Sequence, residues 1–229
     1  MHIERCLSML KLLKICFFTL LLFIKPLYAQ SVAVVSTDAR QWANNKGHEL
    51  IETLGMHDRA TKYAKLDKMM LEDVNLDYIS KFVIGKYARL MNNEQKTRYH
   101  DLFQRYVLSL YKQASFEFDA ETIDFSIDSI TEYPKFTNVS CSVMPPKLSK
   151  DVVIEKIPVK FKLIRGVKNQ IQAVDVEISN VSMVIEYRKR FYQMIIAEQE
   201  NMDWFLDKLQ DKVVANERHI IKTSKQTSL

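Results

Sequence analysis

Glycine, proline and cysteine are scarce in this sequence, and each shortage excludes a class of protein. Four glycines and five prolines in 229 residues leave no glycine-rich phosphate loop and little material for long flexible linkers. Two of the three cysteines lie in the first 16 residues, so Cys141 stands alone in the rest, without a partner for a disulfide or for a paired-cysteine metal or redox site. HExxH and G-x-S-x-G motifs are absent too. We therefore predict that the protein is not an enzyme, with no catalytic residues, no metal and no cofactor.

A hydrophobic run long enough to span a membrane is also missing, although the N-terminus has a shorter one. Arg5, Lys11 and Lys14 precede a largely apolar run of about ten residues, whereas a membrane-spanning helix needs roughly 20. Ala29 then supplies the small residue of a cleavage site. We predict a cleavable signal peptide over residues 1–29, a single domain over residues 30–218, and a polar, disordered tail over residues 219–229.

The exported chain carries no large excess of charge. Removal of residues 1–29 takes away four cations and one carboxylate, so the formal net charge falls from +5 to +2. Nucleic-acid binding calls for a concentrated cationic surface. We therefore predict no nucleic-acid partner.

What the sequence does contain is a strongly amphipathic stretch, residues 78–118. It predicts a short helix that stops at Gly85 and then one long helix, which a capping box of Asn92 and Gln95 begins. The long helix has apolar residues at the three-and-four spacing of a single face, namely Tyr99, Leu102, Phe103, Tyr106, Val107, Leu110, Tyr111 and Ala114. Such a face is typical of ordinary core packing and equally of the wall of a pocket for a large apolar ligand.

The period of the pattern then changes from 3.6 to 2. Apolar and polar residues alternate over residues 123–127, 139–143, 157–163 and 174–178, which predicts consecutive strands joined by short turns. Amphipathic helices are expected over residues 37–54 and 59–73 before the long helix, and over residues 184–195 and 202–213 after the strands. The prediction is an α+β fold, a helical bundle packed on one face of a curved antiparallel sheet of about four strands, with an apolar cavity between them. Cys141 should be buried, because it shares an inward strand face with apolar neighbours.

Two blocks of residues carry a resemblance to a known family. The first block is residues 83–89 (VIGKYAR), followed by Glu94, Gln95, Phe103, Leu110 and Tyr111; the second is residues 173–176 (AVDV), followed by residues 180–184, Tyr187, Arg188 and Phe191. At this spacing they resemble the MlaC/toluene-tolerance auxiliary family of periplasmic lipid-binding proteins over most of the mature chain. Ala88, Ile171 and Asn180 depart from the residues that are usual there, which are an aromatic residue, tryptophan and glycine. Asparagine tolerates the left-handed conformation that glycine favours.

The resemblance implies a periplasmic lipid carrier. Proteins of that family carry phospholipids between an outer-membrane lipoprotein complex and an inner-membrane ABC transporter complex with its substrate-binding lipid-transfer subunit, which maintains lipid asymmetry. Bound phospholipid is then the expected ligand, those two complexes are the expected partners, and a monomer is the expected state. A diacyl lipid in water would expose on the order of 30 methylenes at a cost above roughly 20 kcal/mol, so such a carrier must hide both tails.

We predict that the acyl chains contact the aromatic face of the long helix, the inward face of the sheet and the residues that flank them. These residues are Phe82, Val83, Tyr87, Phe103, Tyr106, Val107, Leu110, Tyr111, Phe125, Ile127, Phe161, Leu163, Val174, Val176, Met183 and Phe191. Arg188 and Arg190, beside Tyr187, are candidates for contact with an anionic head group or a partner, although an exposed helix face gives the same pattern.

Two other functions remain open at the level of sequence. The altered Ala88 and Ile171 are compatible with a carrier for hopanoid or other isoprenoid-type lipids. A domain of this kind is also compatible with a ligand-free adaptor whose helical faces dock on envelope partners.

Overall fold

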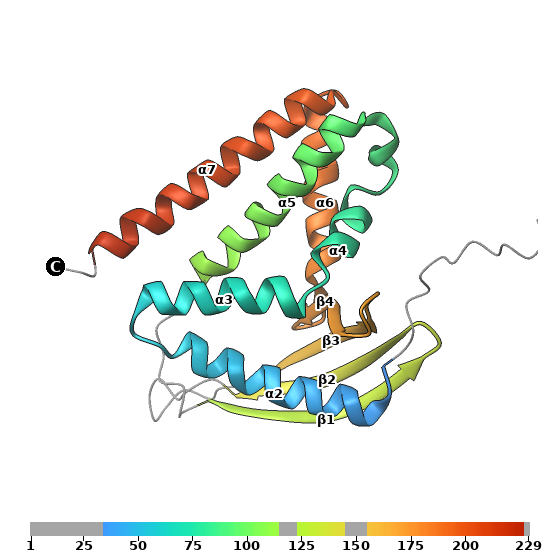
Figure 1. The fold of residues 1–229 in the computed structure, drawn as a ribbon, viewed down its shortest axis with the longest axis vertical. Helices are drawn as coiled ribbons and strands as arrows, with labels where there is room; N and C mark the ends of the chain where they lie inside the picture. Colours follow the sequence, from blue (N-terminus) through green and yellow to red (C-terminus); the bar gives the residue numbers. More distant parts are fainter. Residues whose placement is uncertain (1–33, 115–122, 145–154, 227–229) are drawn as a thin grey trace, which may run out of the picture. The chain divides into compact units, whose positions relative to one another are not determined.

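The computed structural model describes residues 34–114, 123–144 and 155–226, and Figure 1 shows how their helices and strands are arranged. The predicted signal peptide and its cleavage site lie outside these residues. Among the helices described, none is long and apolar enough to cross a membrane. The helices are α2 (Ser36–Leu54), α3 (Arg59–Asp73), α4 (Leu76–Ile84), a 3₁₀-helix η1 (Gly85–Leu90), α5 (Asn93–Ala114), α6 (Met183–Ala197) and α7 (Met202–Gln226).

The ends of these helices follow from local chemistry that the sequence predicts. The capping box is confirmed, because the backbone N–H of Gln95 donates to Asn92 Oδ1 at 2.9 Å and the backbone N–H of Asn92 donates to Gln95 Oε1 at 3.0 Å. Gly85 ends α4 with φ of +48°, a conformation that favours glycine. Asn180 has φ of +65°, so asparagine does adopt the left-handed conformation at this position.

A five-stranded antiparallel sheet lies between α5 and α6 in the chain, with its strands in sequence order. The strands are β1 (Asp124–Tyr133), β2 (Phe136–Met144), β3 (Ile157–Arg165), β4 (Ile171–Ile178) and β5 (Val181–Ser182). The α+β prediction is confirmed, and the fifth strand is a two-residue addition that leads into α6. Two register shifts interrupt the ladder, one between Ile127 and Ser129 and the other between Lys162 and Leu163. Such bulges change which residues face inward.

The last helix is longer than predicted. We expect a disordered tail from residue 219, but α7 continues to Gln226. Contacts with α5 explain this end: Asn216 Nδ2 donates to Ser109 Oγ at 3.0 Å, and Glu217 pairs with Arg105 at 3.0 Å. They hold the helix against α5 beyond Val213, the last residue that is fully buried within the part of α7 whose burial is described.

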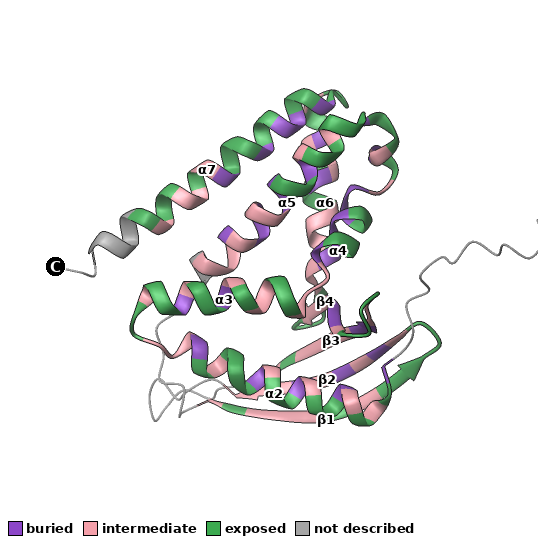
Figure 2. Cartoon of the chain, in the orientation of Figure 1, coloured by how far each residue is buried: buried purple, intermediate pink, exposed green. Residues whose placement is uncertain are grey.

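The buried residues form two separate hydrophobic clusters, and Figure 2 shows how burial is distributed over the elements. The first, here called the helical core, is built from α4, η1, α5, α6 and α7. The second, here called the sheet core, joins Ala39 and Ala43 of α2 to Val139, Leu163 and other inward residues of the sheet. Figure 1 shows α2 lying across β1 and β2, so the α2–α3 hairpin, rather than the long helix, covers this face.

Candidate functional site

An apolar cavity of about 380 Å³ lies between the α2–α3 hairpin and the sheet. This volume falls within the range of roughly 300–1,000 Å³ that is usual for ligand pockets. Apart from Lys46, Asp73 and Tyr111, its described lining is apolar or glycine. The lining consists of Trp42, Lys46, Gly47, Leu50, Ile51, Leu54, Leu66, Met69, Met70, Asp73, Val74, Tyr111, Phe125, Val143, Val159, Phe161, Ala173, Val176 and Ile178.

Four of the predicted lipid contacts meet in this lining. Phe125, Phe161 and Val176 reach it from three strands, and Tyr111 reaches it from the end of α5. Phe161 lies opposite Val176 in the β3–β4 ladder, so both side chains point to the same face. Strand alternation was sufficient to find the three strand positions, and helix periodicity was sufficient to find Tyr111.

The apolar face of α5 does not form the cavity wall that the sequence suggests. Phe103, Tyr106 and Val107 are buried in the helical core, and Leu110 packs against it. Val83, Tyr87 and Phe191 lie in the same core, where the ring of Phe191 is 5.9 Å from that of Phe103 and 5.6 Å from that of Tyr106. The reason is that α6 and α7 present apolar faces of their own, and these faces cover α5. Among its described residues, only Tyr111 reaches the cavity.

The remaining predicted contacts lie beside the cavity rather than in its lining. Leu163 is fully buried in the sheet core, and Ile127 packs against that core. Val174 is displaced by the second register shift, because Ala173 pairs with Leu163 and Val176 with Phe161, which leaves Val174 as the additional residue. Met183 begins α6 and is half-buried.

Phe82 and the two arginines mark a different surface. The Arg188 guanidinium lies over the rings of Phe82, at 4.9 Å, and Tyr192, at 5.1 Å, and donates to Tyr192 Oη at 2.9 Å. Arg190 is exposed on the same helix. Since neither arginine lines the cavity, their role in head-group or partner contact stays a prediction.

The α2–α3 hairpin supplies most of the lining residues that sequence reasoning missed, and the strands supply Val143, Val159, Ala173 and Ile178. Leu50, Ile51, Leu66 and Met69 lie on two helices whose apolar stripes resemble those of any surface helix. These residues line the cavity only because the hairpin packs over the sheet. Gly47 allows this close approach, since a Cβ at this position would lie 2.6 Å from the ring of Phe125. A glycine within a helical pattern was the available signal.

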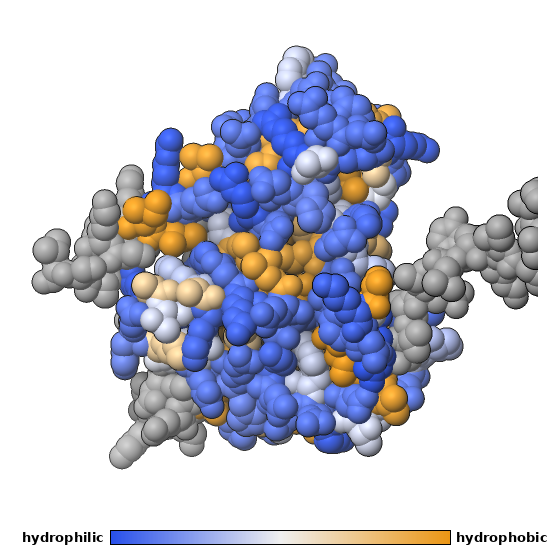
Figure 3. All heavy atoms as spheres, in the orientation of Figure 1, coloured by the Kyte–Doolittle hydropathy of each residue, from blue (hydrophilic) through white to orange (hydrophobic). Residues whose placement is uncertain are grey.

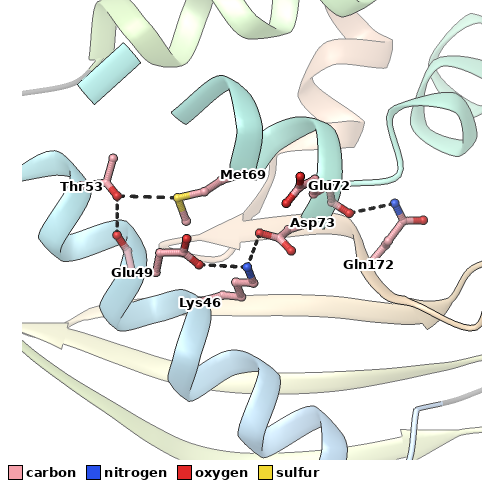
Figure 4. Close-up of polar contacts among 7 residues, drawn as sticks. All are labelled: Lys46, Glu49, Thr53, Met69, Glu72, Asp73 and Gln172. Atoms are coloured by element: carbon pink, nitrogen blue, oxygen red, sulfur yellow. Dashed lines mark hydrogen bonds and ion pairs between the residues drawn. The ribbon is translucent and has the colours of Figure 1, made fainter. Parts of the chain in front are cut away.

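Two polar groups of the lining pair with each other across the hairpin, as Figure 4 shows. Lys46 Nζ lies 2.9 Å from Asp73 Oδ2 on α3 and 2.9 Å from Glu49 Oε2 on α2. The contact with Asp73 is an ion pair without the geometry of a hydrogen bond. Burial raises the pKa of Asp73 despite the nearby ammonium. Burial also acts to lower the pKa of Lys46, but its contacts with Asp73 and Glu49 outweigh it and raise that pKa.

Three further contacts hold the hairpin in place. Thr53 Oγ1 donates to Met69 Sδ at 3.8 Å, a weak link between α2 and α3 (Figure 4). Gln172 Nε2 donates to the carbonyl oxygen of Glu72 at 3.1 Å, which ties the end of α3 to β4 (Figure 4). Tyr111 Oη donates to Asp67 at 2.8 Å and ties α3 to α5. Figure 3 shows a strip of apolar surface between α3 and α5 on this side of the molecule.

Metal chemistry finds no support in the described ranges. No group of three or more His, Cys, Asp or Glu side chains that could hold a metal ion occurs within residues 34–114, 123–144 and 155–226. Cys141 is a free, buried thiol there, as predicted.

The fold is similar to that of a solved structure. This is the phospholipid-binding protein from Ralstonia solanacearum in complex with a phospholipid, with a TM-score of 0.58 and 13% sequence identity over 76% of this chain and 97% of that chain. At this identity the likeness concerns the fold. None of the curated proteins matches the chain.

A family model gives the relationship directly. The model of the MlaC protein family matches residues 49–211, which include most of the α2–α3 hairpin, the whole sheet and α6. MlaC proteins are periplasmic lipid-binding carriers and not enzymes. Because the match spans more than half of its length, this chain belongs to the MlaC protein family.

Proposed function

We propose that this protein carries phospholipid through the periplasm, with the acyl chains in the cavity between the α2–α3 hairpin and the sheet. The observation that supports this most is the cavity itself, whose lining is apolar except for Lys46, Asp73 and Tyr111. Such a lining would shield lipid tails from water, at about 0.8 kcal/mol for each methylene. The donor and acceptor of the lipid would be the inner-membrane ABC-type complex and the outer-membrane lipoprotein complex.

Two acyl tails need a large apolar volume, and the α2–α3 hairpin is the element that we propose to move as they enter. About 30 methylenes, each comparable to a water molecule with its share of roughly 30 Å³ of liquid volume, occupy on the order of 900 Å³. The hairpin is the element that would move, because its two helices are joined to each other by a single short turn and its contacts with the sheet around the cavity are mainly apolar.

Lipid extraction tests the proposal. Purified protein from the periplasmic fraction should release phospholipids into organic solvent, and mass spectrometry identifies them. A Val176→Phe variant, which fills the cavity, is the matched control and should release less. If the extract contains isoprenoid-type lipids, the ligand belongs to that class and not to the phospholipids. If the extract contains no lipid, the result favours the ligand-free adaptor function.

No residue of the described structure favours the isoprenoid alternative over phospholipid. Ala88 packs against the helical core and Ile171 against the sheet core, and neither lines the cavity. Their departure from the usual residues therefore does not alter the described cavity wall.

A further inference from the structure

Lys46 is an unusual residue for an apolar wall. Within the described lining it is the sole cation and Asp73 the sole carboxylate, and their side chains are only 29% and 16% exposed. A partly buried ion pair contributes little to stability, since the loss of hydration offsets the attraction. Apolar residues of similar size would serve equally well if the wall had only to be closed. The pair therefore calls for a role beyond packing.

The Lys46 side chain lines the cavity and is partly open to water. Lysine in such a position lays its methylenes along apolar surface and keeps its charged end at the border with water. Here one partner of the ammonium, Asp73, is mostly buried, whereas the other, Glu49, is 47% exposed. A phospholipid has its phosphate at the same border, between apolar tails and a hydrated head group.

One N–H of the ammonium is left for a ligand. Lysine has three donors, and the described structure directs one of them to Glu49 in a hydrogen bond at 2.9 Å, while Asp73 is an ion-pair partner at 2.9 Å (Figure 4). Glu49 on α2 and Asp73 on α3 both lie 2.9 Å from the ammonium. A phosphate oxygen that approaches from the cavity side would complete its coordination with a charge-assisted hydrogen bond.

We infer that Lys46 binds the phosphodiester of the carried lipid through its ammonium. This rests on the proposed function and specifies its ligand: lipids with a phosphate next to the glycerol are selected over neutral lipids with the same tails. The head-group alcohol is not read at this position.

The simplest competing explanation is that Lys46 only ties α2 to α3. Two substitutions separate the two roles. Lys46→Met keeps the stem and removes the charge, so it abolishes both roles. Asp73→Asn removes the tie between the helices but leaves the ammonium, so it preserves phosphate binding.

The experiment measures lipid selection in a single vesicle population. Full-length mature protein is incubated with vesicles of dioleoylphosphatidylcholine that contain a minor share of dioleoylglycerol, which has the same tails without the phosphate. After separation from the vesicles, mass spectrometry gives the ratio of the two lipids bound. Lys160→Met is the matched control, because Lys160 is 38% exposed, pairs with Glu177 at 2.8 Å, and lies between two cavity-lining residues of β3 on the opposite face of the strand.

Lys46→Met should lower the bound ratio of phospholipid to diacylglycerol about tenfold, since hydrogen bonds to charged groups are of that order. Asp73→Asn and Lys160→Met should leave the ratio within about twofold of wild type. Lys46→Met leaves Asp73 without its cation, so the double variant Lys46→Met/Asp73→Asn serves if the single variant does not fold. It should show the same loss.

Four results would overturn the inference. They are an unchanged ratio in the double variant, an equal fall in Asp73→Asn and Lys46→Met, no preference for phospholipid in wild type, and displacement of the lipid by inorganic phosphate, which would make the site one for the free anion. In each case the protein still takes up lipid from the vesicles when no inorganic phosphate is added, so the carrier function stands. Wild-type protein that takes up neither lipid would instead contradict the proposed function.

Discussion

The helical core and the cavity side of the molecule use aromatic residues in opposite ways. Around Phe191 the rings of Tyr99, Phe103, Tyr106 and Phe205 lie with centroids 5.6 to 6.3 Å away, and the Phe191 side chain is fully buried. On the cavity side Phe125 and Phe161 are only half-buried and face open space. The comparison shows that regularly spaced aromatic residues predict a face that is shielded from water. The spacing does not predict whether that face packs against other protein side chains or against a bound ligand.

The largest expected effect separates these two regions. Phe191→Ala should lower the free energy of unfolding by about 3–5 kcal/mol, because it leaves a cavity among packed rings. Chemical denaturation measures this loss. Lipid content per folded molecule should not change, since Phe191 does not line the cavity.

Phe161→Ala is the matched change on the other side. It should cost less stability than Phe191→Ala and alter lipid content, because the Phe161 ring faces the cavity and Trp42. Equal losses of stability in the two variants would contradict the distinction between core and cavity wall.

The next largest effect comes from substitutions that add volume to a side chain, whereas the two substitutions above remove volume. Val107→Phe, in the helical core, should lower stability by about 1–3 kcal/mol through overpacking and leave lipid content unaltered. Val176→Phe, in the cavity wall, should reduce bound lipid with nearly the same melting temperature of the lipid-free protein. Thermal unfolding and lipid counting on both variants check this. A large fall in melting temperature for Val176→Phe would show that its side chain is already closely packed.

Much of this fold could be predicted because its signals are local. The capping box at Asn92, the glycine stop at Gly85 and the strand alternation at Phe125 and Phe161 each depend on residues close in sequence. The choice of partner for a helix face is not local. The face of α5 is equally compatible with a sheet or with α7, and only the presence of two later helices with apolar faces decides between them.

The cavity was harder to predict for a related reason. Its lining comes from several elements, and the two that were missed, α2 and α3, have no single residue that marks them as a wall. Val174 illustrates the limit of alternation, because one inserted residue in β4 moves it off the face that Val176 shares with Ala173. Nothing near Val174 in the sequence signals that insertion.

Paired cap variants test the same comparison with a smaller effect. Asn92→Ala removes the cap of α5 and should cost about 1 kcal/mol of stability without changing lipid exchange. Asp58→Ala removes the cap of α3, where Asp58 accepts from the Thr61 amide at 2.9 Å, and should speed lipid release because it loosens the hairpin. Stopped-flow transfer of a fluorescent phospholipid to acceptor vesicles measures release. Equal release rates in the two variants would mean that the hairpin is not the moving element.

The smallest expected effect is the labelling of Cys141, which distinguishes the packed sheet core from the cavity beside it. Burial, assisted by the negative charge of Asp128, raises the pKa of this thiol to about 12, so almost no thiolate is present at neutral pH. A thiol reagent should therefore react only through opening of the fold.

The raised pKa of Cys141 also predicts that the free energy of unfolding falls as pH rises. The fall should begin near the thiol pKa of the unfolded chain, about 8.5, and continue to about 12, because the unfolded chain releases its proton first.

A relocated thiol supplies the control for this labelling experiment. The double variant Cys141→Ser/Val143→Cys moves the thiol two residues along β2, from the sheet core to a position in the cavity lining. The relocated thiol should label faster than Cys141, and added phospholipid should protect it, because lipid would then cover that part of the wall. Rapid labelling of Cys141 in the native protein at neutral pH would contradict the packed sheet core. Labelling of the relocated thiol that is equally slow with and without phospholipid would contradict a lipid-accessible wall.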